Sequence, residues 1–146
     1  MPSAALDATV LVSAFLTPGG VSDELLRQAR EGAFVVVLSE DILAEVVHTL
    51  GYPRIRRRYS YTDEDVRVFC AGLREAASLV PIPAKIPAVV RDPNDDTVLA
   101  TAHAADATYL ITRDLDLVSL QSYEGITIIT PEAFMAILRE HGRTHP

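Results

Sequence analysis

Cysteine, lysine and long apolar runs are all scarce in this sequence of 146 residues. The single cysteine, Cys70, rules out an internal disulfide and fits a reducing cytoplasm. No uninterrupted apolar stretch approaches the roughly 18 residues of a membrane span. The first residues also lack a basic segment followed by a long apolar one, so we expect no secretory signal. These absences together predict a cytoplasmic protein without membrane association.

Positive charge is also in the minority, because thirteen lysine and arginine residues face twenty acidic ones and the net charge is −7. A general duplex-binding protein normally shows a basic face, so the charge argues against that class. It leaves room for an enzyme that reaches phosphate through metal ions. The one basic concentration is either a solvated loop or a surface that contacts RNA or a partner protein, with candidate residues Arg56, Arg57 and Arg58.

Strands and helices alternate along the whole chain. Short apolar runs predict strands, for example at 33–38, 109–112 and 126–129, and helical patterns lie between them. This alternation is typical of βαβ units and of a parallel sheet covered on both faces. We therefore predict an α/β fold, a three-layer α/β/α sandwich with a central parallel sheet of Rossmann-like type. The length fits one domain over residues 1–146, and the hydrophobic content of 49% excludes disorder.

Polar side chains that can cap helices mark where the predicted helices begin. Ser22 and Ser39 stand before two helical patterns, and Asn94 or Asp95 stands before a third. Thr62 and Asp65 resemble a capping pair for a long helix. Gly51 and Pro53 are expected to end the helix that begins after Ser39, which would leave the arginine run in a loop.

Acidic residues are concentrated where predicted strands end and helices begin. Asp7 follows the first apolar run, Asp114 follows the strand at 109–112, and Asp96 stands near the start of a helix together with Asp92 and Asp95. Ligand sites in open parallel sheets form outside the carboxyl ends of the strands. Carboxylates gathered there repel one another unless a hard cation lies between them. This pattern predicts a site for Mg²⁺ or Mn²⁺.

Each of these acids also has a purely structural explanation. Asp95 and Asp96 can be helix N-terminal charges, Glu45 a helix-surface residue, and Asp114 a turn residue. Asp7 is the hardest to explain in this way, because apolar residues flank it on both sides and buried carboxylates need partners. As a set, the acids favour a functional site.

Four acidic motifs occur in order along the chain. The first is LDATVLV with Asp7, the second LSEDILAEV with Glu45, the third RDPNDDTVLATA with Asp96, and the fourth YLITRDLDL with Asp114 and Asp116. In this order and at these elements they resemble the motifs of PIN-domain proteins, in particular the VapC-like ribonucleases that act as toxins in bacterial toxin–antitoxin pairs. The resemblance extends nearly end to end.

The resemblance implies a metal-dependent endoribonuclease that uses Mg²⁺ or Mn²⁺, with an antitoxin partner and a homodimeric state. It implies that metal-bound water attacks the RNA phosphate without a covalent intermediate. The implied acidic site consists of Asp7, Glu45, Asp96 and Asp114, with Asp116 close by as a further ligand. Thr9, Ser39 and Thr112 are candidate hydrogen-bonding supports, although Ser39 is equally explained as a helix cap. The sequence departs from the family's Asp-Thr-Asn at Asp7-Ala8-Thr9, which puts full activity in doubt.

Two other functions are considered. Asp114-Leu115-Asp116 after a strand suggests a phosphatase with an aspartyl nucleophile, but that chemistry usually needs a committed lysine. The only lysine, Lys85, stands in a proline-rich stretch. The second alternative is an inactive PIN fold that only binds RNA or a partner protein, and the departure at Thr9 favours it.

Overall fold

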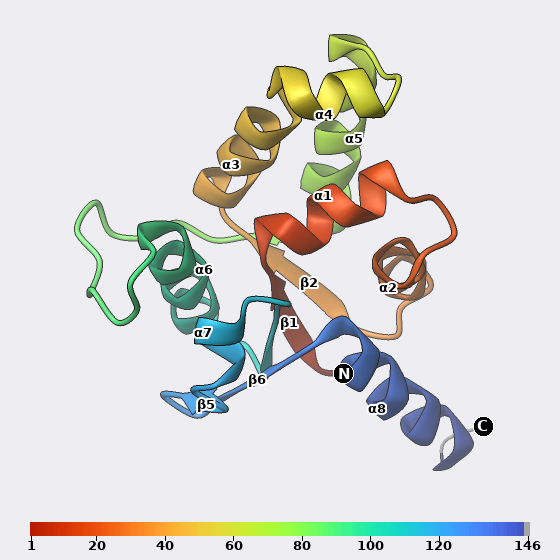
Figure 1. Cartoon of the computed structure of the whole chain (residues 1–146). Coiled ribbons are helices and arrows are strands. Elements are labelled where there is room, and N and C mark those ends of the chain that lie inside the picture. Colours follow the sequence, from red (N-terminus) through yellow and green to blue (C-terminus); the bar gives the residue numbers. More distant parts are fainter. Residues whose placement is uncertain (145–146) are drawn as a thin grey trace.

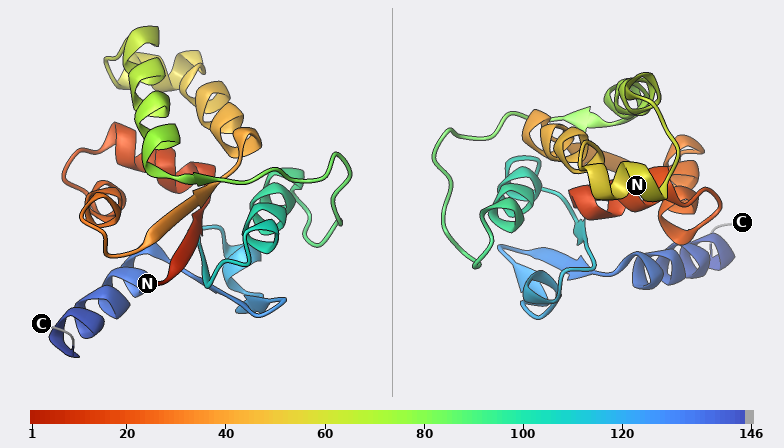
Figure 2. Two further views of the ribbon diagram at one scale, coloured as in Figure 1. Left: turned by 180° about the vertical axis from the view of Figure 1, so that it is seen from behind. Right: turned by 45° about the horizontal axis from the view of Figure 1, so that its top comes forward.

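A six-stranded sheet forms the centre of the computed structural model, which describes residues 1–144. The strand order is β3-β2-β1-β4-β6-β5, and every neighbouring pair is parallel except β5 with β6. Helices flank the sheet (Figures 1 and 2), so the predicted α/β fold is confirmed. The strands are β1 (Ser3–Leu6), β2 (Val35–Leu38), β3 (Ser78–Leu79), β4 (Tyr109–Ile111), β5 (Ser122–Tyr123) and β6 (Ile126–Ile129).

Eight helices connect or follow the strands within the described part of the chain. None of them has both the length and the apolar character that crossing a membrane requires. The prediction of one domain over 1–146 also includes residues 145 and 146, which lie outside the described residues. The helices are α1 (Ala8–Leu16), α2 (Val21–Arg30), α3 (Glu40–Leu50), α4 (Pro53–Arg58), α5 (Asp63–Ala76), α6 (Pro93–Ala104), α7 (Leu115–Val118) and α8 (Pro131–Thr144).

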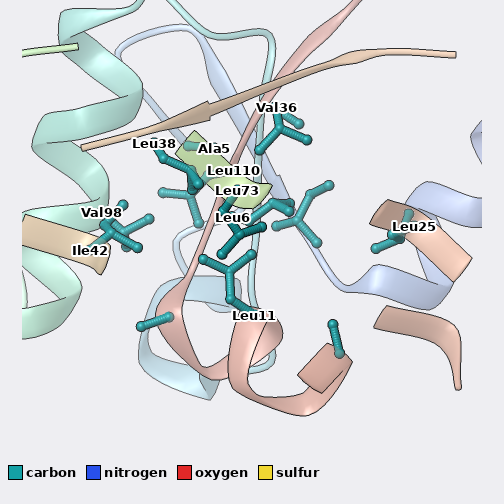
Figure 3. Packing of buried hydrophobic residues seen from close by; sticks show 14 of the residues in the cluster. Ala5, Leu6, Leu11, Leu25, Val36, Leu38, Ile42, Leu73, Val98 and Leu110 are labelled. Carbon is teal, nitrogen blue, oxygen red and sulfur yellow. The ribbon is translucent and has the colours of Figure 1, made fainter. Parts of the chain in front are cut away.

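The hydrophobic core surrounds β1, which lies between β2 and β4. Its residues Ala4, Ala5 and Leu6 are fully buried, so neither face of this strand contacts solvent. Leu6 lies beside Leu11 of the first helix (Figure 3), whereas Leu110, which pairs with Ala5, points to the other face of the sheet. A strand covered on both faces reads as a continuous apolar run, and this explains why the sequence shows no alternation here. Each large apolar side chain buried in this way stabilises the fold by about 1.5–3 kcal/mol.

The order in which strands are added to the sheet changes side at β1. From β1 the chain continues through β2 to β3 on one side, and it then returns to β4 on the other side of β1. Such a switch point leaves a crevice outside the carboxyl ends of the two strands concerned. The residues that directly follow β1 and β4 are therefore placed next to each other at this edge.

Several predicted boundaries are wrong in detail. The arginine run is not a loop but helix α4, because Pro53 at its first turn restarts the helix instead of only ending α3. Ser22 lies inside α2, which begins after Gly20. The cap of α6 is Asp92, not Asn94 or Asp95, and its carboxylate accepts a hydrogen bond from the backbone N–H of Asn94 at 2.9 Å. Strand β5 has no counterpart in the sequence-based prediction.

Candidate active site

Asp7 occupies the end of the central strand, and its side chain is 4% exposed. It serves as the cap of α1, because its Oδ1 accepts a hydrogen bond from the backbone N–H of Thr9 at 3.4 Å. Its other oxygen, Oδ2, accepts a hydrogen bond from the Thr112 hydroxyl at 2.7 Å. Both bonds stabilise the ionised form, yet burial raises the pKa of Asp7, and the negative charge of Asp114 adds to that effect.

Thr112 joins the two strand ends. Its hydroxyl donates to Asp7 and also accepts a hydrogen bond from the backbone N–H of Asp114 at 3.0 Å. The pairing of Leu6 with Ile111 in the sheet brings these residues together, because each is followed directly by a polar residue of the site. These bonds place Thr112 where it can orient Asp7, and its role as a support of the site stays a prediction. The sequence signal was its position immediately after a strand.

Asp114 begins helix α7 and is half-buried. Its Oδ1 accepts hydrogen bonds from the backbone N–H groups of Asp116 at 2.9 Å and Leu117 at 3.3 Å. One carboxylate oxygen is therefore used to cap the helix. Asp116 is exposed and takes part in this geometry through its backbone.

Asp95 lies with these acids although the sequence prediction named its neighbour. It is 5% exposed, and within the described residues its Oδ2 has no hydrogen-bond partner. Burial, followed by the charges of Asp114, Asp7 and Asp92 and by a side-chain hydrogen bond with Asp114, raises the pKa of Asp95 to about 7. A buried carboxylate oxygen without a partner is rare in folded proteins, so the Oδ2 of Asp95 is a candidate cation ligand.

The carboxylate of Asp96 is bound by the backbone, and its role as a metal ligand stays a prediction. Its Oδ1 accepts hydrogen bonds from the backbone N–H groups of Val89 at 2.8 Å and Val90 at 2.9 Å. Consecutive residues of a helix point about 100° apart, so the side chains of Asp95 and Asp96 leave the helix in different directions. Asp96 fastens the segment before α6 to the helix, and Asp95 lies with Asp7 and Asp114.

Glu45 is half-buried in α3 and faces the same acids. Burial, followed by the charges of Asp7 and Asp92, raises the pKa of Glu45 to about 7. The prediction placed Asp92 at the start of the helix but not in the site. Because its charge acts on Glu45 and Asp95, we include Asp92 at the edge of the acidic site. Five acidic residues from four parts of the chain form this acidic site, namely Asp7, Glu45, Asp92, Asp95 and Asp114.

The remaining predicted supports act on the fold. Ser39 caps α3 by accepting from the backbone N–H of Ile42 at 3.3 Å, and its hydroxyl lies 2.9 Å from that of Thr101 in α6. This buried pair connects the two helices that carry Glu45 and Asp95. Thr9 is exposed and contributes its backbone N–H to Asp7.

The arginines of α4 do not act as one group. Arg56 forms an ion pair with Asp63, and its guanidinium lies over the ring of Tyr61 at 5.2 Å from the centroid. Arg57 and Arg58 are exposed. Helix α4 follows the carboxyl end of α3, whereas the amino end of α3, capped by Ser39, follows β2 (Figure 1).

The acidic site has the donor chemistry of a divalent cation site. In the described part of the chain, no lysine or arginine forms an ion pair with any of its five acids. The unpartnered oxygen of Asp95 and the raised pKa values of Asp7, Glu45 and Asp95 fit a cation that would replace the protons. The predicted convergence is incomplete, since among residues 1–144 no three acidic, histidine or cysteine side chains are already arranged to hold a metal ion. A cation would have to draw these carboxylates closer together.

Comparisons with known proteins identify the fold and the family. A solved structure described as VapBC2 from Rickettsia felis bound to a DNA fragment from their promoter contains a chain with a similar fold. The TM-score is 0.60 at 14% sequence identity, over 88% of this chain and 98% of that one. No curated protein matches the sequence. The sequence model of the PIN domain matches residues 3–116, which is well over half of the chain. The chain therefore belongs to the PIN-domain family.

Proposed function

We propose that this protein is an endoribonuclease that depends on Mg²⁺ or Mn²⁺ and acts as the toxin of a toxin–antitoxin pair. PIN domains are generally nucleases, so hydrolysis of a phosphodiester bond is the activity to expect. The observation that carries the proposal is the group of mutually repelling carboxylates at the switch point between β1 and β4, of which Asp7 and Asp95 are buried. Its most informative atom is the unpartnered Oδ2 of Asp95.

Asp7, Asp95 and Asp114 are the residues that would hold the cation, and Asp95 replaces Asp96 in the set that we expected. When bound, a divalent ion supplies charge stabilisation at the scissile phosphate and acidifies water. Thr112 fixes the Asp7 carboxylate in one orientation and ties it to the loop of Asp114. Glu45, with a pKa of about 7, is suited to accept a proton near neutral pH.

The phosphatase alternative is disfavoured because its committed lysine is lacking. The only lysine of the sequence, Lys85, is exposed in the segment before α6. An inactive PIN fold stays the main competing hypothesis, because the exposed Thr9 side chain stands where the family resemblance implies an amide.

An antitoxin, a homodimer and a cytoplasmic location belong to the same proposal. The antitoxin is supported by the similar fold in the VapBC2 structure, and the homodimer by the family resemblance. The exposed Arg57 and Arg58 offer positive charge for RNA or for a protein segment that competes with RNA.

The test is cleavage of single-stranded RNA by the purified protein with Mg²⁺, with Mn²⁺ and with chelator. We expect metal-dependent cleavage that D7N and D95N reduce at least 100-fold. The matched control is D96N, which changes the neighbouring acid and should retain more activity than D95N. If the folded wild-type protein leaves RNA intact in both metals, the inactive fold is the better hypothesis. If D96N and D95N lose activity equally, the assignment of Asp95 is wrong.

A further inference from the structure

An apolar pocket lies next to the acidic site and has no role in the function described so far. Its volume is about 170 Å³. Its walls come from the segment before α6, from one face of α6, and from Tyr123 of β5. That segment makes a wide excursion beside α6 (Figure 1). The pocket is open to solvent at Ala104 and His103, which are both exposed.

The pocket is held open beside the acidic site by a specific contact. Asp96 lines the pocket, and its bonds to the backbone of Val89 and Val90 fix the outer wall at a set distance from the helix. Asp95, the preceding residue of the helix, belongs to the acidic site. The Cα atoms of consecutive residues are about 3.8 Å apart, so this end of the pocket, lined by Asp96, lies close to the acidic site.

The lining favours a neutral flat ring over a charged group. Prolines and aliphatic side chains make up most of it, and Asp96, His103 and Tyr123 add a few polar groups at its rim. No lysine or arginine among the described residues lines the pocket, and the Asp96 carboxylate would repel a phosphate. A cavity of about 150 Å³ is known to accept a benzene ring, so this pocket has room for a single aromatic ring system. Few polar groups in an apolar cleft are typical of small-ligand sites.

We propose that this pocket receives an unpaired base of the RNA strand, next to the phosphate held at the acidic site. The inference rests on the proposed function, since it assigns a base subsite to that same substrate. The base would lie against the apolar walls, and an exocyclic amino group would donate a hydrogen bond to Asp96. An aspartate accepts from the N4 amino group of cytosine in the same way elsewhere. The pocket therefore determines which nucleotide stands beside the cleaved bond.

A side chain that fills the pocket provides the test. In A104F the phenyl ring would lean back along α6 toward Ala100, because helical side chains point toward the helix N-terminus. A100L is a smaller second variant, and A71F on the exposed face of α5 is the matched control. Binding is measured with short single-stranded oligonucleotides of A, C or U in Ca²⁺, with the melting temperature of each variant checked first.

We expect A104F to weaken binding of the preferred oligonucleotide about tenfold, and A71F to leave it unchanged. Replacing each nucleotide in turn by an abasic one should reveal one position that weakens wild-type binding to a similar extent. The same abasic oligonucleotide should bind A104F and wild type equally, which shows that the base and the new phenyl ring compete for one place.

The results separate this proposal from the proposed function. If A104F abolishes base-dependent binding but the wild-type protein cleaves no RNA, the base-binding pocket is supported and the nuclease function is rejected. Metal-dependent cleavage with the same binding and the same sequence preference in folded A104F and A100L rejects the pocket. If A104F binds RNA like the wild type but no longer binds a protein that co-purifies with the wild type, the pocket holds an apolar protein side chain and the proposal is overturned.

Discussion

Replacing Asp95 by asparagine should stabilise the metal-free protein at alkaline pH. Asp95 is buried among acids, and its pKa of about 7 lies well above the value of 3.8 expected for an exposed aspartate. Between these two pH values the folded state binds a proton that the unfolded state has lost. Stability therefore falls as the pH rises from about 4 to above 7. Asparagine has nearly the same shape and carries no charge, so it removes this cost.

The size of the effect follows from the shift in pKa. One pKa unit corresponds to about 1.4 kcal/mol, and solvent screening around the half-buried Asp114 reduces the full value considerably. We expect a gain of roughly 1–2 kcal/mol at pH 8, or about 3–8 °C in melting temperature. At pH 4 the aspartate is already protonated in the folded state, so D95N and wild type should differ little.

Urea unfolding at pH 4 and pH 8 in the presence of chelator measures this effect directly. Saturating Mg²⁺ at pH 8 should reverse the order, because only the wild type gains from binding the cation. D96N serves as the control with the opposite sign, since it weakens two bonds to the backbone and should destabilise the protein by about 1 kcal/mol. A D95N protein that is less stable than wild type at pH 8 without metal would refute the reasoning.

The remaining predictions concern the support of the site and its charges. T112V keeps the side-chain shape but loses the bonds to Asp7 and to the Asp114 backbone, so it should cost about 1–3 kcal/mol in urea unfolding and weaken Mg²⁺ binding. Unchanged stability would show that these bonds are dispensable. Mg²⁺ affinity, measured by calorimetry, should be lower at pH 6 than at pH 8, because Glu45 and Asp95 must lose protons on binding. Replacing Arg57 and Arg58 together by alanine should weaken RNA binding and flatten its salt dependence without changing the melting temperature. R56A should instead lower stability by up to about 1 kcal/mol, through the lost pair with Asp63; a strong loss of RNA binding in R56A alone would contradict this division.

The sequence determined the fold class and most of the elements. The strand at residues 3–6 is apolar on both faces, and this could be read directly because a central strand leaves no face in water. The capping pair of Thr62 and Asp65 and the cap at Ser39 were also predictable, since they act within three residues of their partners. Asp7 could be recognised as a candidate site residue because apolar residues flank it on both sides and a buried carboxylate needs a partner.

Only the tertiary structure decided which of two adjacent aspartates lies unpaired with backbone beside Asp7 and Asp114. A carboxylate at the start of a helix has the same local preferences at Asp95 as at Asp96, so no local pattern distinguishes them. The choice depends on how α6 is rotated against the sheet, and that rotation is set by packing between residues far apart in the sequence. The same reason applies to Asp92, whose charge reaches Glu45 and Asp95 only after α3 and α6 have come together.

The separation of the arginines also required the folded chain. The arginines from residue 54 to residue 58 look equivalent in the sequence. In the structure, Arg56 forms an ion pair with Asp63 and lies over the ring of Tyr61. Likewise the pocket beside the acidic site exists only because Asp96 fastens the preceding segment to its own helix. Local propensity fixes where strands and helices form, but contacts between distant residues fix which side chains remain free to bind a cation or RNA.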